Sequence, residues 1–345
     1  MNKVLIIGPN YFNFLSATRK AFEELGWSAE VCPYDNPIHP YTTCMKWRYK
    51  MSWDREAMQR RSRMQFNLLL MRHFERFNPT LVFVLNGDII ETATLDFFRS
   101  KAKVALWFFD SRLKLASSLD HVDHVDALFC FEQADVDWYL AQGKQAHFLP
   151  QACDTQVYFP IEHVRKNIDI LFVGNLFYSL RRQRLIETVV KAFPSRRIKV
   201  FGIYRPWYKG VIRWLTMRHR NIYANHNLPP EKVNLYYNRA KVVLNIHQEH
   251  QKMGANPRVF EICGAGAYQV CDANPYIDSL FEKDDIGIYH DEKELISCVQ
   301  AALERDMRAN ATKAYLTTMQ QHTFVRRIQT VLTVVGQHGQ VSVTH

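Results

Sequence analysis

The chain has 345 residues, 47% of them hydrophobic, and a formal net charge of +10; this composition excludes wholesale disorder and predicts two domains of ordinary size. No apolar run reaches the length of about 18 residues that a transmembrane helix needs, and the amino terminus lacks the cleavage pattern of a signal peptide. Seven single cysteines without a C-x-x-C pair indicate reduced thiols, and together these features predict a cytoplasmic protein.

The first half of the chain alternates predicted strands with predicted helices. Gly8-Pro9-Asn10 follows the first strand without forming G-x-G-x-x-G, which disfavours a dinucleotide-binding oxidoreductase. The alternation predicts a mostly parallel sheet with helices on both faces. Apolar runs predict strands at 4–7, 28–32, 81–85, 104–109, 127–131 and 147–149, and helical spacing predicts helices over 12–25, 54–77 and 133–142.

The alternation stops around residues 150–160, P-Q-A-C-D-T-Q-V-Y-F-P, and the domain boundary is placed there, near residue 155. A second α/β unit follows, and two such units are typical of an enzyme with a cleft. Its predicted strands are 168–173, 198–202, 242–245 and 267–271, and its predicted helices begin near Leu180, Pro230 and Pro257, cover 291–320, and run from His322 to Val335.

The positive charge is local. Residues 1–158 carry 18 basic and 18 acidic residues, whereas residues 159–345 carry 26 basic and 16 acidic residues. Residues 181–220 alone hold 12 basic residues and one acid, Glu187, which predicts a local anionic partner. Within this patch, residues 207–220 interleave aromatic and basic side chains, as an interfacial helix on an anionic membrane does. The alternative is an ordinary amphipathic helix packed on its domain. No nucleic-acid-binding motif accompanies the patch, so no nucleic-acid partner is expected.

A polar stretch follows the strand at 242–245. Pro257 fits the first turn of a helix, a position that does not need its N–H. Arg258 and Glu261 then lie three residues apart on one helical face, at the carboxyl end of a strand. In an open α/β sheet ligands bind at this edge, and a helix amino terminus there favours anions. The alternative is a solvated surface pair.

Several pieces of the second half resemble, in order, the CgeB-like branch of group 1 glycosyltransferases with the GT-B fold. The resemblance covers about residues 149–335, and the first half matches more loosely through W-F-F-D at 107–110. The pieces are L-P-Q-A-C-D at 149–154, F-V-G-N at 172–175 with R-R at 181–182, Y-Y at 236–237, L-N-I-H at 244–247, N-P-R-V-F-E at 256–261 with G-A-G-A at 264–267, and H-T-F at 322–324 with R-R at 326–327.

This resemblance implies an α/β protein of the GT-B fold, with two Rossmann-like domains facing across a cleft. Residues 1–155 would bind the acceptor, residues 156–322 would bind the donor, and the helix and tail at 323–345 would pack back on the first domain. The implied reaction transfers a sugar from a nucleotide-diphosphate-sugar, UDP-sugar being favoured, to a hydroxyl of a surface glycan. The acceptor would be free or, in view of the proposed interfacial helix at 207–220, lipid-linked, and the enzyme would be cytoplasmic or peripheral at the inner face of the membrane. An inactive GT-B protein that binds a nucleotide or glycan is the alternative.

The resemblance also implies the donor-binding residues. Glu261 would hold the ribose hydroxyls, while Arg258 with Arg181 and Arg182 would neutralise the diphosphate, whose charge develops as the glycosidic bond breaks. Such enzymes usually need no bound metal, and the chain has no D-x-D motif, so neither metal nor other cofactor is expected. The full predicted donor set is Gly174, Asn175, Arg181, Arg182, Asn256, Arg258, Glu261 and Gly264.

The catalytic candidates are Asp88, Asp110, His247 and Glu249. Asp88 and Asp110 each end a strand of the first half, where either one, or His39, would deprotonate the acceptor in an inverting enzyme. A retaining enzyme needs no such base. Related transferases carry a glutamate eight residues before the ribose-binding one, but Met253 stands there and Glu249 lies twelve before Glu261, which leaves Glu249 and His247 as alternatives near the sugar.

Two runs have the composition of metal ligands. They are D-H-V-D-H-V-D at 120–126 and the pair His247 and His250. Polar surface segments look the same, so no metal site is expected from either run. We expect the nucleotide base to be chosen by a pocket beside residues 202–206 and 226–232.

Overall fold

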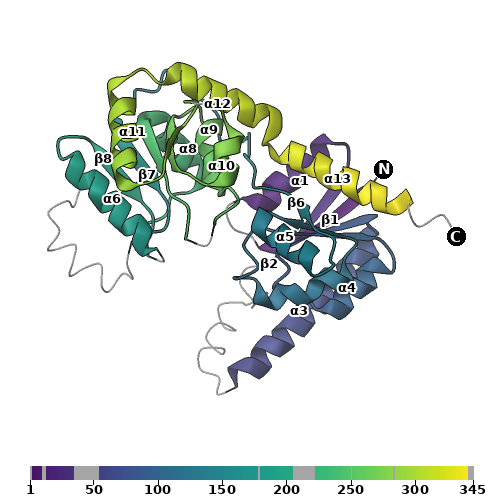
Figure 1. The fold of residues 1–345 in the computed structure, drawn as a ribbon. Coiled ribbons are helices and arrows are strands. Elements are labelled where there is room, and N and C mark those ends of the chain that lie inside the picture. The colour runs from purple at the N-terminus through teal and green to yellow at the C-terminus, as the bar shows by residue number, and fades with distance from the viewer. Residues whose placement is uncertain are drawn as a thin grey trace. The chain divides into compact units, whose positions relative to one another are not determined.

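The computed structural model describes residues 2–9, 13–34, 54–177, 179–204, 222–249, 251–282 and 284–340. The chain forms two compact units (Figure 1). Unit 1 comprises Met1–Pro150 together with Phe324–His345, and unit 2 comprises Gln151–Thr323. The last helix therefore belongs to the amino-terminal unit.

Unit 1 is built on a six-stranded parallel sheet in the order β2-β1-β3-β4-β5-β6. Every residue of β3 is buried, because helices cover both faces and each strand must be apolar on both sides. The strands are β1 (Lys3–Pro9), β2 (Ser28–Tyr34), β3 (Leu81–Leu85), β4 (Lys103–Phe108), β5 (Ala127–Cys130) and β6 (His147–Phe148).

The helices of unit 1 divide between the two faces of its sheet. On one face α3, α4 and α5 pack on alternate strand residues such as Val82, Val84 and Leu106. On the other face α13 lies beside α1, where the Phe14 and Phe324 rings are 6.2 Å apart (Figure 1). The helices are α1 (Phe14–Glu24), α3 (Arg55–Phe77), α4 (Thr92–Arg99), the 3-10 helix η1 (Ala116–His124), α5 (Gln133–Ala141) and α13 (Phe324–Gln340).

Unit 2 has a five-stranded parallel sheet in the order β11-β10-β9-β7-β8. One face packs against α6 and α11, and the other against α8, α9, α10 and α12. The strands are β7 (Ile168–Val173), β8 (Ile198–Phe201), β9 (Ala240–Asn245), β10 (Gln269–Asp272) and β11 (Gly287–Tyr289). The helices are α6 (Leu180–Ala192), α8 (Pro230–Arg239), α9 (Pro257–Gly264), α10 (Pro275–Leu280), α11 (Glu292–Glu304) and α12 (Arg308–Gln321).

The order of strands in unit 2 reverses between β7 and β9. The chain passes from β7 to β8 on one side and then returns to β9 on the other. At such a switch point the loops leave in opposite directions and open a crevice at the carboxyl ends of the strands. The predicted donor residues 174–182 and 245–261 follow these two strands.

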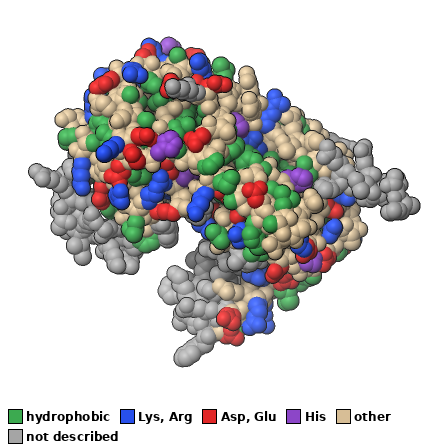
Figure 2. Space-filling view, in the orientation of Figure 1, with side chains coloured by type: hydrophobic (Ala, Val, Ile, Leu, Met, Phe, Trp, Pro, Cys, Tyr) green, Lys and Arg blue, Asp and Glu red, His purple; other side chains and the backbone are tan. Residues whose placement is uncertain are grey.

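The predicted strand alternation is confirmed, and four elements were missed: α4, η1, α10 and β11. The six described cysteines are all free. Among the described helices, none combines the length and the apolar character that crossing a bilayer requires. Basic and acidic side chains are interspersed on the face shown in Figure 2. Residues 205–221 lie outside the described part of the chain, so the proposed interfacial helix at 207–220 stays a prediction.

Candidate functional site

A carboxylate occupies the amino terminus of α6. Ser179 caps this helix by accepting a hydrogen bond from Arg182 N, and the Ser179 hydroxyl donates to Glu249 Oε1 at 2.8 Å. The same oxygen accepts from Arg181 N at 3.3 Å. Partial burial alone would raise the pKa of Glu249, but these hydrogen bonds lower it. The amino terminus of α6 therefore already holds a negative group, supplied by the loop after β9.

Arg182 lies buried beneath that carboxylate, with 8% of its surface exposed. Its Nε donates to the carbonyl oxygen of Ile246 at 2.7 Å, and its Nη1 donates to that of Asn175 at 3.1 Å. Burial lowers the pKa of Arg182 to about 10. Both hydrogen-bond acceptors are neutral, and among the described residues no carboxylate lies within ion-pair distance of this guanidinium. The side chain ties together the loops after β7 and β9, and the charges of Asp272 and Glu249 act on it without forming an ion pair.

Arg181 instead points to the end of β10. Its Nη1 donates to Asp272 Oδ2 at 2.7 Å, and the His247 ring donates from Nδ1 to Asp272 Oδ1 at 2.7 Å. His247 Nε2 accepts the Asn256 N–H at 3.2 Å, so the proton must sit on Nδ1. Burial alone would raise the pKa of Asp272, but the contacts with His247 and Arg181 lower it to about 2. Asp272 thus fixes both side chains.

His247, Cys271 and Asp272 form a cluster of metal-ligand type, with their ligand atoms within 4.8 Å of one another. Burial holds the pKa of the Cys271 thiol well above its usual value, which opposes the thiolate that a metal would need. His247 Nδ1 also has no lone pair for a metal, because it carries the hydrogen atom that it donates in the hydrogen bond to Asp272. The hydrogen bonds within the cluster account for it better than a metal would.

The amino terminus of α9 is held by an asparagine pair. The Asn256 side chain accepts from Val259 N at 3.2 Å as the helix cap, and its Nδ2 donates to Asn245 Oδ1 at 2.9 Å. Pro257 occupies the first turn, as the sequence predicts. Asn256 therefore positions α9 against the end of β9, with both functions of its amide engaged.

Arg258 and Glu261 form an ion pair on α9, with 2.6 Å between Nη1 and Oε2. The same Nη1 donates to the Tyr237 hydroxyl at 3.2 Å. Burial alone would lower the pKa of Arg258, but the Glu261 charge outweighs it and raises the pKa. The other guanidinium N–H groups have no partner among the described residues. Arg258 is thus a fixed cation with donors left for an anion.

Gly174 and Gly202 lie back to back where β7 and β8 end. Gly202 has a φ of +131°, and a Cβ there would lie 2.0 Å from the Gly174 carbonyl oxygen. Asn175 Oδ1 accepts from Ile203 N at 3.2 Å and joins the same two strand ends. Gly264 is different: it ends α9 far from the cap, and a Cβ would lie 2.3 Å from Cys153 Sγ. The structure therefore gives Gly264 a packing role.

Most of unit 2 lies in a stretch whose sequence resembles known proteins. Residues 181–333 match a family model described as glycosyl transferase-like. Spore protein CgeB of Bacillus subtilis (strain 168) is 25% identical over 219 residues, which cover 59% of this chain and 67% of that protein. The predicted resemblance is confirmed: the chain is similar to CgeB and to glycosyl transferase-like proteins, and its fold is that of GT-B glycosyltransferases.

Solved structures support the same fold for this CgeB-like chain. A UDP-forming alpha,alpha-trehalose-phosphate synthase from Burkholderia vietnamiensis superposes with a TM-score of 0.63 at 11% identity, covering 97% of this chain and 99% of that one. A mutant of TarM from S. aureus, solved with fondaparinux, alpha-GlcNAc-glycerol and UDP, gives a TM-score of 0.58 at 10% identity, covering 78% of this chain and 59% of that one. At these identities the match concerns the fold alone.

The candidate acceptor residues of the CgeB-like chain follow neighbouring strands of unit 1. Asp88 comes after β3 and Asp110 after β4, and both are half-buried. Lys114 Nζ lies 3.8 Å from Asp110 Oδ1. Between them, Asn86 has a left-handed φ of 61° and its side chain accepts from Phe109 N at 2.8 Å. Asparagine readily adopts this conformation, and its side chain joins the ends of β3 and β4; Asn86 was not predicted.

The metal-like run at 120–126 is dispersed into separate contacts. His124 pairs with Asp96 at 2.7 Å, and Asp126 accepts from Val104 N at 2.8 Å. Asp123 pairs with Lys144. These side chains bind different neighbours, so they are not assembled around one ion. His39, His250 and residues 205–206 of the predicted base pocket lie outside the described residues.

Two residues of the donor unit, Ser179 and Asp272, were missed by sequence reasoning, and Gly202 was expected only as part of the base pocket beside 202–206. Asp272 follows a strand directly, so the rule that selected Asp88 and Asp110 also applies to it. Ser179 stands just before a helical pattern, which is the usual signature of a cap. Gly202 has no local signal, because its role depends on the neighbouring strand.

We expect Asp272 to stabilise the fold by about 2 kcal/mol at pH 7, since its pKa is lowered from 3.8 to about 2 and each unit corresponds to about 1.4 kcal/mol. A lowered carboxyl pKa contributes stability above the unfolded value that is lost as the pH falls from 3.8 towards 2. Asp272→Asn should therefore lower the free energy of unfolding in urea about twice as much at pH 7 as at pH 3. Asp278→Asn, a change to an exposed side chain in the first turn of α10, is the control. An equal loss at both pH values would contradict this account.

Proposed function

We propose that this chain transfers a sugar from a UDP-sugar to a hydroxyl of a surface glycan, and that unit 2 binds the donor. The observation that carries the proposal is Arg182, a buried cation with neutral hydrogen-bond acceptors at the switch point of the sheet. Placing a charge there is unfavourable unless an anion completes the site. UDP is favoured because, of the two solved structures with this fold, one is a UDP-forming synthase and the other was solved with UDP.

The diphosphate would bind at the amino terminus of α6, where the Glu249 carboxylate lies in the ligand-free state. Arg181 and Arg182 belong to the first turn of that helix, and Arg258 is near enough for its charge to act on Arg182. Of the three neighbouring carboxylates, those of Asp272 and Glu261 are buried in ion pairs, and only Glu249 is exposed. Glu249 is therefore the one that an incoming diphosphate can replace, which would leave the arginines to stabilise the leaving group.

Glu261 would accept hydrogen bonds from the ribose hydroxyls, and Arg258 would hold it in place while binding a phosphate. His247, with both ring nitrogens engaged, would act by fixing the loop rather than as a base. Charge stabilisation by three arginines replaces the role that a metal plays in other phosphate chemistry, so we propose transfer without a bound metal.

Unit 1 would bind the acceptor near Asp88 and Asp110, at the carboxyl edge of its sheet. Either carboxylate would serve as base if the reaction inverts the sugar. A lipid-linked acceptor fits the proposed interfacial segment at 207–220, which would hold the enzyme at the inner face of the membrane. A surface glycan is in keeping with the relatives CgeB, a spore protein, and TarM, solved with alpha-GlcNAc-glycerol.

The proposal is tested by incubating the purified chain with a panel of UDP-sugars and measuring UDP release, with and without glycan acceptors and with and without EDTA. Release that survives EDTA supports a metal-independent transferase. UDP binding without release from any donor would favour the alternative, an inactive binding protein. Absence of UDP binding by calorimetry would overturn the donor assignment itself.

We expect Glu249→Gln to raise UDP affinity about five- to tenfold, because it removes a negative group that competes for a helix amino terminus, an interaction of about 1 kcal/mol. Calorimetry of the variant and of Glu294→Gln, an exposed change in the first turn of α11, gives the comparison. A catalytic or sugar-binding role for Glu249 predicts the opposite sign or no gain. Weaker UDP binding by Glu249→Gln would therefore refute the displacement step.

A further inference from the structure

The hydroxyl group of Tyr289 is buried and makes no hydrogen bond. Tyr289 ends β11 at the carboxyl edge of the unit 2 sheet and is 1% exposed. Among the described residues, its hydroxyl has no hydrogen-bond partner. A buried tyrosine usually finds a partner for this group, because an unmade hydrogen bond in the interior is unfavourable. The unpaired hydroxyl lies at the same sheet edge as the candidate donor site, so a role in that site would account for it.

Asp272 is the neighbour of Tyr289 on the adjacent strand. The two residues are register partners of β10 and β11, so their side chains leave the same face of the sheet and their backbones are about 4.8 Å apart. Burial raises the pKa of Tyr289, and the carboxylate of Asp272 is the strongest of the charges that act on it. The charges of Arg181 and Arg182 act on the same hydroxyl in the opposite direction. Tyr289 therefore extends into the group of charged side chains at the donor site.

The two oxygens of Asp272 have different partners. Oδ1 accepts from the backbone N–H of His247 at 2.9 Å and from His247 Nδ1 at 2.7 Å. Oδ2 accepts from Arg181 Nη1 at 2.7 Å and shares the His247 backbone N–H at the longer distance of 3.2 Å. Oδ2 therefore depends mainly on Arg181, whereas Oδ1 is satisfied by His247 alone.

Of this ion pair, the arginine is the partner that is free to move. The Arg181 side chain is 39% exposed and that of Asp272 only 6%. Arg181 belongs to the first turn of α6, where the diphosphate is proposed to bind, and a diphosphate carries more negative charge than one carboxylate. A diphosphate would therefore attract Arg181 away from Asp272. The carboxylate would remain buried, and a buried charge that loses its partner is strongly unfavourable.

We propose that Tyr289 is a positioning residue of the donor site: when a diphosphate attracts Arg181 away from Asp272, the Tyr289 hydroxyl donates to the Asp272 oxygen that the arginine has left. This exchange rests on the proposed function of unit 2. It keeps Asp272 satisfied in both states, so that His247 and its loop stay in place while Arg181 binds the diphosphate. The hydroxyl is unpaired in the ligand-free chain because its hydrogen bond belongs to the bound state.

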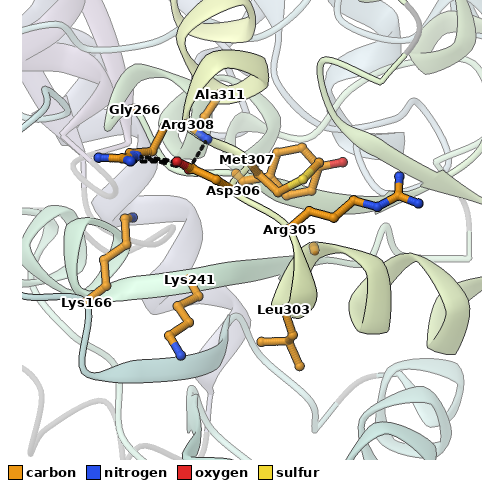
Figure 3. A pocket seen from close by; sticks show the side chains of 11 residues that line it. Lys166, Lys241, Gly266, Leu303, Arg305, Asp306, Met307, Arg308 and Ala311 are labelled. Carbon is orange, nitrogen blue, oxygen red and sulfur yellow. Dashed lines mark hydrogen bonds and ion pairs between the residues drawn. The ribbon is translucent and has the colours of Figure 1, made fainter.

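The first test separates stability from UDP affinity in Tyr289→Phe. Without ligand the hydroxyl has no partner, so its removal should leave the urea midpoint unchanged or raise it. UDP binding, measured by calorimetry, should weaken at least about tenfold, because the bound state loses a hydrogen bond to a charged group. Tyr268→Phe is the matched control. Tyr268 lines a cavity at the amino ends of the strands (Figure 3), about 13 Å along β10 from Asp272, and its loss of a hydroxyl should change neither quantity.

The second test repeats the unfolding measurement in an Arg181→Met background. Removing the arginine leaves Asp272 Oδ2 open without any ligand, and Tyr289 should then pair with it. In this background Tyr289→Phe should lower the urea midpoint by about 0.5 M or more, although it has no such effect in the original chain. Arg184→Met removes an exposed arginine of the same helix, and in that background Tyr289→Phe should behave as it does in the original chain. A hydroxyl that only fills space would give the same result in all three backgrounds.

Two results would overturn this inference. One is an unchanged UDP affinity of Tyr289→Phe when the original chain binds UDP. The other is an equal effect of Tyr289→Phe on the urea midpoint with and without Arg181. Absence of UDP binding by the original chain would instead refute the proposed function. The unfolding comparison needs no ligand, so it would still decide whether Tyr289 replaces Arg181 on Asp272.

Discussion

Glu261→Ala is expected to weaken UDP binding by at least about 100-fold. The carboxylate would accept hydrogen bonds from two ribose hydroxyls, and hydrogen bonds to a charged group contribute about 1.5–3 kcal/mol each. The substitution also leaves Arg258 without its ion-pair partner, 2.6 Å away, at a site where that charge is largely buried. Breaking a buried pair from one side costs about 3–5 kcal/mol, so the free energy of unfolding should fall by a similar amount.

Affinity and stability must therefore be measured separately for Glu261→Ala. Calorimetry with UDP is carried out at a temperature where circular dichroism shows the variant folded. Tyr237→Phe is the matched control, because it removes another contact of Arg258 Nη1, at 3.2 Å, and leaves the carboxylate in place. We expect its UDP affinity to stay within about threefold of the original. A folded Glu261→Ala variant with unchanged UDP affinity would refute the ribose assignment.

The strands of both sheets were the most predictable part of the fold. β3 and β7 were predicted with their observed bounds, because helices cover both faces of each sheet and every strand residue is buried. β11 has only three residues and α10 only six, too few to establish a period. The eight residues of α4 follow a turn at Asn86 and Gly87, both with positive φ, and were missed in a stretch between two predicted strands.

The sequence predicted which residues lie at the proposed donor site better than it predicted their contacts. Arg181 and Arg182 are adjacent, but a helix turns about 100° per residue. The half-exposed Arg181 therefore reaches the buried Asp272, while Arg182 is buried against Asn175 and Ile246. Sequence alone does not give the rotation of the helix, which is set by its packing on the sheet. The capping contact of Glu249 likewise joins residues about 70 positions apart and depends on the strand order.

The close approach of Gly202 to Gly174 also depends on the strand order. Gly202→Ala is expected to lower the free energy of unfolding by about 4 kcal/mol or more. Its φ of +131° disfavours any L side chain, and the added Cβ would lie 2.0 Å from the Gly174 carbonyl oxygen and 2.5 Å from its carbon. Backbone atoms cannot rotate away as a side chain does, so the ends of β7 and β8 must separate. That movement displaces Asn175, whose carbonyl oxygen binds Arg182, and UDP affinity should fall with stability.

Gly143→Ala separates backbone strain from this close approach. Gly143 also has a positive φ, +73°, but nothing lies within 4 Å of its added Cβ. It should therefore cost only the strain of a left-handed residue, about 1–2 kcal/mol, and leave UDP binding unchanged. Urea unfolding and UDP calorimetry of both variants give the comparison. If Gly202→Ala were no more destabilising than Gly143→Ala, the ends of β7 and β8 would not be in close contact. The Asn175 carbonyl group would then not be a fixed partner that holds Arg182 beneath the proposed diphosphate site.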